Sequence, residues 1–404
     1  MRFAIESRDH EQVHERNSWG KARMIRGSDN GRIPELDGIR GIAIGLVVVY
    51  HYFYLTLVAT PGSFWSYLLA SERLSWTGVD LFFVLSGFLI GGILVDARGS
   101  SNYFKVFYTR RFFRIVPLYV VWLCGVQVMV WMIWLGVAKR SGWFLQDHLP
   151  GLPFVVFLQN FWMASRGTLG GPTAGGTWSL AIEEQFYLTL PLLIRFVDIR
   201  RKRWVVLAGI IIAPVLRIMC FSTSPPRNFA AVTLMPCRAD ALLFGVLGAL
   251  LWRDERWRAK LESNPRFMQF LLAVLLAGAG FLTIHAGAWN GAMVQTLGLT
   301  WMAALYLCFL LCGISQPGNW LSACLRWRWL TGLGAIAYGV YLIHFYARAF
   351  LYQMIWSTDS NEIATVGQFV ATLLAIPLTL AVCQLSFIFF EKPLIRIGHR
   401  WKYE

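Results

Sequence analysis

Long apolar runs recur along this chain from about residue 38 to residue 390. A lipid bilayer offers no hydrogen-bond partners, so a spanning segment must satisfy its backbone within a helix or a closed barrel. The runs are of helix length, about 20 residues, and lack the strict alternation of barrel strands. With 56% hydrophobic and 15% charged residues among 404, the sequence predicts an all-α fold, a polytopic membrane helix bundle.

We predict about ten transmembrane helices. Their approximate ranges are 38–60, 78–97, 115–137, 178–197, 204–220, 235–252, 267–286, 291–314, 329–356 and 363–390. The chain then divides into a polar, disordered cytosolic tail at 1–32, a membrane domain at 33–394 and a short cytosolic tail at 395–404. The first segment lacks the short apolar core and small-residue cleavage site of a signal peptide.

The formal charge of +15 could indicate nucleic-acid binding, but the basic residues form short clusters beside the apolar runs. This pattern is typical of the positive-inside rule, so we expect the lipid bilayer as partner and no nucleic acid. It predicts a multi-pass protein of the inner (plasma) membrane with both termini cytosolic. The predicted inner clusters lie at 105–114, 200–203, 253–260, 326–328 and 392–402.

The longest predicted outer connection, roughly 138–177, combines aromatic segments with the glycine-rich stretch "GTLGGPTAGGT". We expect it to fold back on the membrane as a lid or re-entrant element with a glycine hinge. Seven scattered cysteines form no CxxC pair, and no HExxH is present. The sequence therefore indicates neither a disulfide framework nor a metal site.

Ionisable residues inside apolar spans are costly, which makes them candidates for function. In "IRGIAIGLVVVYH", Arg40 and His51 are eleven residues apart. On an α-helix this separation is three turns plus about 20°, so both side chains share one face, about 16 Å apart along the axis. We therefore expect Arg40 and His51 to line one channel.

A second set of polar residues is expected near the depth of His51. Helix rise places Glu183 and Glu184 of "TWSLAIEEQFYL" one or two turns below the outer boundary, at a depth similar to that of His51. A histidine oriented by a carboxylate is suited to act as a general base. The same reasoning places five more residues in the outer half of the membrane: Asp80, Ser86, Arg238, Asp240 and His344.

A third candidate is the basic segment "YTRRFFRIVPLYV". Arg110, Arg111 and Arg114 would present their guanidinium groups as one patch if the segment is helical. Positive-inside anchoring explains such a cluster, and a phosphate-binding site is the alternative because the planar guanidinium matches phosphate geometry.

Together these segments resemble the acyltransferase family 3 of integral membrane O-acyltransferases. The matching stretches are "ELDGIRG" with the spacing from Arg40 to His51, "GVDLFFVLSGFLI", "RRFFRIVPLY", "TWSLAIEEQFYL", "CRADALLFG", "YGVYLIHF" and "FFEKPL". They run from about residue 34 to residue 394, nearly the whole chain.

The resemblance implies transfer of an acyl group, with acetyl expected, from cytosolic acyl-CoA to a hydroxyl of a glycan or other envelope acceptor. It implies acyl-CoA, with acetyl-CoA expected, as donor substrate and no permanently bound cofactor. His51 would be the essential histidine, aligned by Glu184 or Glu183, and would serve as general base or as transient acyl carrier. Arg40, Arg110, Arg111 and Arg114 would bind acyl-CoA. The residues assigned to an acceptor pocket or a supporting role are Asp80, Ser86, Trp178, Arg238, Asp240, Tyr338 and His344.

Two other functions fit part of the pattern. A proton-coupled transporter could use the same intramembrane Arg, His and Glu residues, but it would favour an inverted repeat and leave the arginine triplet unexplained. A catalytically inactive scaffold is disfavoured because His51, Arg40 and the glutamate pair are all present. The sequence leaves the acceptor and the oligomeric state open.

Overall fold

The computed structural model describes residues 33–135, 151–223, 229–285, 291–356 and 362–404. Regular structure in these residues is helical, apart from one isolated bridge between Leu57 and Ile363. The long helices are α2 (Pro34–Val49), α4 (Gly78–Asp96), α5 (Tyr103–Trp134), α9 (Thr177–Phe196), α10 (Ile199–Thr223), α12 (Met235–Arg253), α14 (Pro265–His285), α15 (Leu299–Ser315), α18 (Ala337–Trp356) and α19 (Val366–Ser386). This confirms the all-α class.

Shorter helices connect or extend these spans. They are α3 (Phe64–Ser71), η2 (Glu72–Thr77), α6 (Gly151–Val155), α7 (Gln159–Arg166), α8 (Gly171–Gly175), α11 (Phe229–Thr233), α13 (Glu255–Ser263), α16 (Trp320–Leu325), α17 (Arg328–Ala335) and α20 (Lys392–Gly398). Three segments are π-helical: η1 (Tyr50–Tyr54), η3 (Val294–Gly298) and η4 (Phe387–Glu391). Such segments are rare and often mark functional sites.

Eight helices in the described ranges are long and apolar enough to cross a membrane, or nine if α17 and α18, bent by 80°, form one span. The predicted span at 178–197 is the helix α9, which carries Glu183, Glu184 and Arg195 and is not among the spans that meet this criterion. The predicted helix at 38–60 ends earlier, because η1 stops at Tyr54. The predicted helix at 115–137 begins earlier, at Tyr103, so the arginine triplet is helical.

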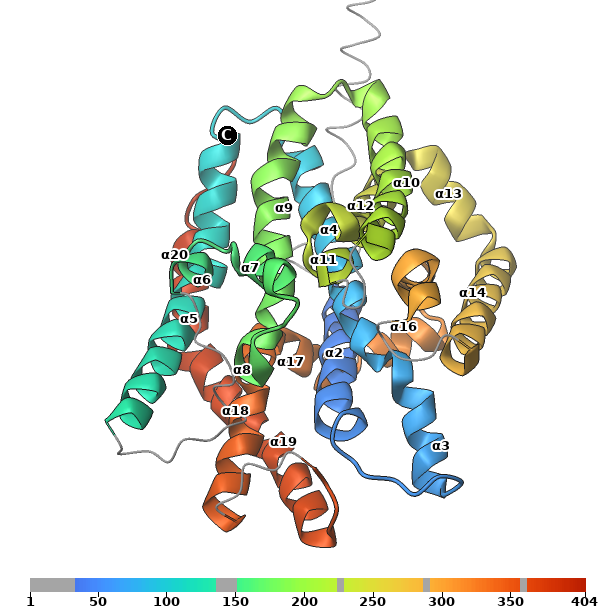
Figure 1. Ribbon diagram of the computed structural model, residues 1–404. Helices are drawn as coiled ribbons and strands as arrows, with labels where there is room; N and C mark the ends of the chain where they lie inside the picture. The colour runs from blue at the N-terminus through green and yellow to red at the C-terminus, as the bar shows by residue number, and fades with distance from the viewer. Residues whose placement is uncertain (1–32, 136–150, 224–228, 286–290, 357–361) are drawn as a thin grey trace, which may run out of the picture.

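Figure 1 shows the C terminus and the turn between α9 and α10 at one end of the bundle. The helix α3 and the adjoining ends of α18 and α19 lie at the other end. The positive-inside rule assigns the first two segments to one side of the membrane and the others to the opposite side. The two basic segments therefore lie together at one end of the bundle, and their cytosolic orientation stays a prediction.

The connection predicted to fold back lies partly in 136–150, outside the described residues. Its described part folds against neighbouring helices, because α7 packs against α9 and α11; its position on the membrane stays a prediction. The amides of Asn160 and Gln185 are hydrogen-bonded at 2.9 Å, and Gln159 donates to the Thr177 carbonyl at 3.0 Å. Gly167, Gly170 and Gly171 adopt left-handed backbone angles, with φ of 62°, 77° and 80°.

The helices α4 and α12 form an extensive contact because small residues let their backbones approach closely. A Cβ atom added at Gly87 would overlap the carbonyl oxygen of Leu242, and one added at Gly245 would overlap that of Val84. Gly41 makes a similar approach to the Leu330 carbonyl of α17. By contrast, Gly45 has no atom within 4 Å of its added Cβ position.

We expect Gly87→Ala to lower the free energy of unfolding by about 1–3 kcal/mol, since the two backbones must move apart. Gly45→Ala, the matched control in open space, should be neutral or slightly stabilising because alanine favours the helix. The midpoint of thermal unfolding in detergent measures both. Equal effects of the two substitutions would show that the α4–α12 approach is not tight.

Candidate functional site

His51 lies at the start of η1, where the helix widens from α to π. Its Nδ1 atom is 2.8 Å from the Val47 carbonyl oxygen and 3.4 Å from Nε2 of His344, which belongs to α18. The aromatic ring of Phe345 packs against the His51 ring at a centroid distance of 4.6 Å. His51 is only partly buried, and its Nε2 has no hydrogen-bond partner among the described residues.

The structure therefore pairs His51 with a histidine rather than with a carboxylate. Neither Glu183 nor Glu184 forms a hydrogen bond with His51 in the described residues. Both glutamates lie on α9, and a similar predicted depth did not bring them into contact with the imidazole. His344, predicted as a supporting residue, is the side chain that meets it.

Ser86, Tyr187 and Glu183 form a chain of hydroxyl and carboxylate groups between α4 and α9. The Ser86 and Tyr187 hydroxyls are 2.5 Å apart, and the Tyr187 hydroxyl lies 3.3 Å from Oε2 of Glu183. The guanidinium of Arg111 lies over the Tyr187 ring at 5.9 Å and interacts electrostatically with Glu184. This places the predicted residues Ser86, Glu183 and Glu184 beside the basic segment.

Arg111 and Arg114 of α5 lie near the glutamates of α9 but make no close ion pair with them in the described structure. Neither forms an ion pair with a carboxylate within 4 Å in the described part of the chain. Arg40 interacts electrostatically with both, although its own Nη1 is paired with Asp37 at 2.9 Å. Unpaired arginines inside a helix bundle are costly unless an anionic ligand compensates them.

Arg110 points elsewhere. Its Nε and Nη2 donate to the carbonyl oxygen of Trp401 at 3.0 and 2.5 Å, and its guanidinium lies 5.1 Å from the Tyr403 ring. The predicted patch of three guanidinium groups is therefore divided. Arg111 and Arg114 are near Arg40, while Arg110 holds the C-terminal segment.

The hydroxyl of Tyr338 donates to the Ile115 carbonyl at 3.1 Å, and this residue interacts electrostatically with Glu184 and Glu391. Tyr341 lies between the histidine pair and Glu183 of α9 and interacts with both. Its carbonyl contacts Nδ1 of His344 at 2.9 Å, and it interacts electrostatically with Glu183. Both tyrosines belong to α18.

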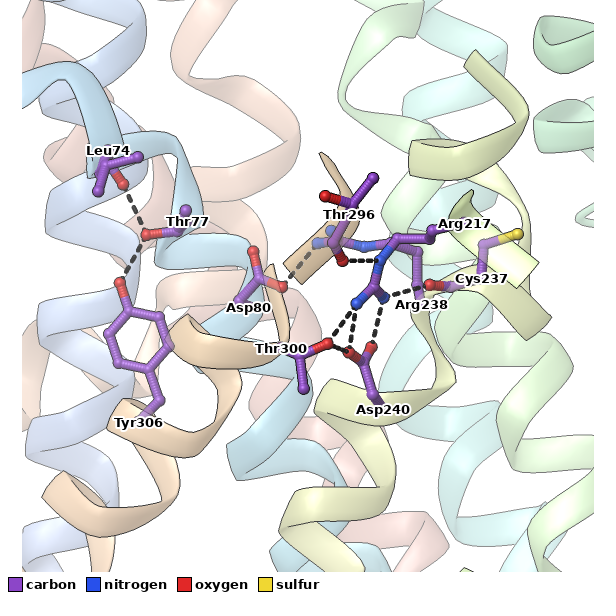
Figure 2. A network of polar contacts seen from close by, with 10 residues as sticks. All are labelled: Leu74, Thr77, Asp80, Arg217, Cys237, Arg238, Asp240, Thr296, Thr300 and Tyr306. Atoms are coloured by element: carbon purple, nitrogen blue, oxygen red, sulfur yellow. Dashed lines mark hydrogen bonds and ion pairs between the residues drawn. The ribbon is translucent and has the colours of Figure 1, made fainter. Parts of the chain in front are cut away.

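A separate network of buried ion pairs joins α4, α10, α12 and α15 (Figure 2). Arg217 donates to both carboxylate oxygens of Asp240 at 2.9 and 2.8 Å, and Arg238 donates to Asp80 at 2.7 Å. Thr300 donates to Asp240 at 2.7 Å. Arg238 also lies over the ring of Trp178 at 5.6 Å. Four side chains predicted for an acceptor pocket or a supporting role thus belong to this network: Asp80, Trp178, Arg238 and Asp240.

The side chains of this network are less exposed to solvent than the other polar residues described above. The side chains of Arg217 and Arg238 are 0% exposed, and those of Asp80 and Asp240 are 1% and 2% exposed. Arg40, His51, Arg111, Arg114, Glu183 and Glu184 are all partly exposed. Groups without solvent access are suited to hold helices together, and partly accessible groups are suited to meet a ligand. The candidate site is therefore the second set, with His344.

Sequence reasoning missed several residues of these networks. Arg217 and Arg348 are cations inside apolar runs, and this placement could have marked them as candidates. Tyr187, Tyr341 and Glu391 had weaker signals, although Glu391 lies within the motif "FFEKPL". No group of three or more metal-ligating side chains occurs among the described residues.

Chemically, the site combines a histidine with an open Nε2, arginines and partly exposed carboxylates inside a helical membrane protein. This defines the class: a multi-pass membrane protein with a polar site in its interior. The model of the acyltransferase 3 family, described as an acyltransferase domain, matches residues 33–388. The chain belongs to this family.

Two relatives show how this similarity is distributed. "Peptidoglycan O-acetyltransferase OatA" of Listeria monocytogenes is 27% identical over 390 residues, which cover 91% of this chain and 56% of the relative. "Putative peptidoglycan O-acetyltransferase YrhL" of Bacillus subtilis is 28% identical over 389 residues, with the same coverage of 91% and 56%. The chain thus spans little more than half the length of these relatives. No solved structure matches it significantly.

Proposed function

We propose that this protein is a membrane O-acetyltransferase that moves an acetyl group from acetyl-CoA at the cytosolic face to a hydroxyl of an envelope glycan. The observation that carries the proposal is the open Nε2 of His51 in a family of acyltransferases. The names of the relatives favour peptidoglycan as the acceptor class. The proposal includes a location in the plasma membrane with both termini in the cytosol.

The unpaired cations support a phosphorylated donor. Coenzyme A carries several phosphate groups, and arginine binds phosphate through charge-assisted hydrogen bonds. Arg111 and Arg114 form no ion pair within 4 Å with a carboxylate in the described structure, and Arg40 adds a third positive charge close by. In this proposal these three residues bind the phosphates of acetyl-CoA. Arg110 is not assigned to the donor because it holds the Trp401 carbonyl.

The chemical step has two possible routes. In direct transfer, His51 Nε2 removes the proton from the acceptor hydroxyl while its oxygen bonds to the acetyl carbonyl carbon. The carbon–sulfur bond breaks, and the coenzyme A thiolate leaves and is protonated. In the covalent route, Nε2 bonds to the acetyl carbonyl carbon, the carbon–sulfur bond breaks and the coenzyme A thiolate leaves. The acceptor oxygen then bonds to the acetyl carbon, the nitrogen–carbon bond breaks to restore the imidazole, and the hydroxyl proton ends on the thiolate. Both routes require Nε2 of His51 to be unprotonated.

The function is tested with inverted membrane vesicles, whose cytosolic face is outward, supplied with acetyl-labelled acetyl-CoA. We expect label in envelope glycan with the native chain and background label with His51→Ala at equal abundance. The labelled fraction identifies the acceptor. Equal labelling by native and His51→Ala vesicles would remove His51 from the reaction and make proton-coupled transport the next function to test.

A further inference from the structure

The two histidines at the site have a defined order of proton donors and acceptors. Nδ1 of His344 lies 2.9 Å from two carbonyl oxygens, those of Val340 and Tyr341. A carbonyl oxygen only accepts, so this nitrogen carries the proton. In the neutral ring, Nε2 of His344 is then the acceptor, and it faces Nδ1 of His51 at 3.4 Å.

The same reasoning applies to His51. Its Nδ1 faces two acceptors, the Val47 carbonyl at 2.8 Å and Nε2 of His344. Nδ1 of His51 therefore carries a proton, and the two acceptors share this proton. The lone pair of the neutral ring is then on Nε2. We infer that His344 is a positioning residue that acts together with the Val47 carbonyl: the two acceptors hold the proton on Nδ1 and orient the His51 ring, so that Nε2 is the reactive nitrogen. The inference deepens the proposed function and rests on it.

Backbone contacts between η1 and α18 hold the two rings in register. Arg348 donates to the carbonyl oxygens of His51 and Tyr52 at 3.2 and 3.4 Å. In the other direction, the Tyr52 hydroxyl donates to the carbonyl of His344 at 2.6 Å and lies 3.0 Å from the Thr379 hydroxyl. Each histidine-bearing segment is thus bound by a side chain from the other.

Packing restricts the rings further. His344 is 1% exposed, and the ring of Phe345 lies 4.2 Å from the His344 centroid and 4.6 Å from that of His51. The Phe345 ring packs edge-on against the His51 ring and so restricts its rotation. His344 Nε2 accepts the hydrogen bond of His51, and the contact with Phe345 limits the other orientations of the His51 ring.

The role of His344 is tested by two substitutions of similar size, His344→Gln and His344→Met. The glutamine amide oxygen can replace Nε2 as an acceptor, whereas methionine fills the space without a comparable acceptor. Solid-state NMR of the full chain in lipid, labelled with 15N-histidine and assigned with His51→Gln, reports which ring nitrogen of His51 bears the proton. The acetyl-transfer assay gives kcat and KM in parallel.

We expect the proton on Nδ1 of His51 in the native chain and in His344→Gln. In His344→Met the Val47 carbonyl remains as an acceptor but the second acceptor is lost, so we expect a fraction of the His51 rings to carry the proton on Nε2 instead. We also expect kcat to fall about 100-fold in His344→Met with little change in KM for acetyl-CoA, and to be largely retained in His344→Gln. Abundance in the membrane and thermal unfolding control for folding. A purely structural role predicts instead that the two variants lose activity and stability together.

The inference is overturned if the native chain carries the proton on Nε2 of His51, a result that needs no variant. It is also overturned if His344→Met leaves the proton on Nδ1 with native kcat. If the tautomer changes as expected in His344→Met but the native chain transfers no acetyl group, the positioning role holds and the proposed function fails. The two claims are therefore tested separately.

Discussion

Replacing Asp240 with asparagine is expected to lower the free energy of unfolding by about 3–5 kcal/mol, because it leaves the Arg217 cation buried without its anion. The two side chains are 2% and 0% exposed, and both carboxylate oxygens accept hydrogen bonds from the guanidinium. The midpoint of unfolding by heat or denaturing detergent, with the protein in mild detergent micelles, measures the loss.

Two comparisons identify the cause of this loss. The double substitution Arg217→Met with Asp240→Leu removes both charges and should be less destabilising than Asp240→Asn alone. Arg258→Gln breaks an ion pair with Glu262 in which the two side chains are 47% and 44% exposed. It should lower the free energy of unfolding by at most about 0.5 kcal/mol. A loss in Asp240→Asn as small as that in Arg258→Gln would contradict a structural role for the buried network.

Replacing Arg111 with glutamine is expected to raise KM for acetyl-CoA by about 10- to 100-fold. A hydrogen bond to a charged group contributes about 1.5–3 kcal/mol, and about 1.4 kcal/mol corresponds to a tenfold change in affinity. Arg111 forms no ion pair within 4 Å with a carboxylate of the described chain, so its guanidinium can bind a donor phosphate. Initial rates of acetyl transfer at varied acetyl-CoA concentration measure the effect.

Arg110→Gln is the matched control, since it removes the same group from the preceding residue. The Arg110 guanidinium already donates to the Trp401 carbonyl, so KM for acetyl-CoA should change little. Acetyl-pantetheine, which lacks the nucleotide and its phosphates, provides a second control, because its KM should be the same for the native chain and Arg111→Gln. An equal rise in KM for both donors would show that Arg111 does not recognise phosphate.

The pairing of His51 shows how far helix geometry alone can predict a site. The periodicity of "IRGIAIGLVVVYH" placed Arg40 and His51 on one helix face, and counting residues placed Glu184 at a similar depth. In the structure the partner of His51 is His344, 293 residues away in sequence, and both glutamates face the basic segment instead. Depth along a helix does not specify which helix is adjacent.

The sequence by itself determined the class of fold, the positions of nearly all long helices and the local order of polar residues along each. For example, the predicted span 78–97 is the helix Gly78–Asp96. These features follow from the bilayer, which forces each apolar run to satisfy its own backbone as a helix. They require no knowledge of neighbouring segments.

Only the tertiary structure decided which polar residues meet. It paired His51 with His344 and Asp240 with Arg217, and it bent α17 against α18 by 80°. It also left Arg111 without an ion pair within 4 Å in the described chain. These outcomes depend on the rotation and approach of whole helices, which close contacts such as that of Gly87 with the Leu242 carbonyl set. Helical periodicity defines the faces of one helix, whereas packing between helices selects the partner of each face.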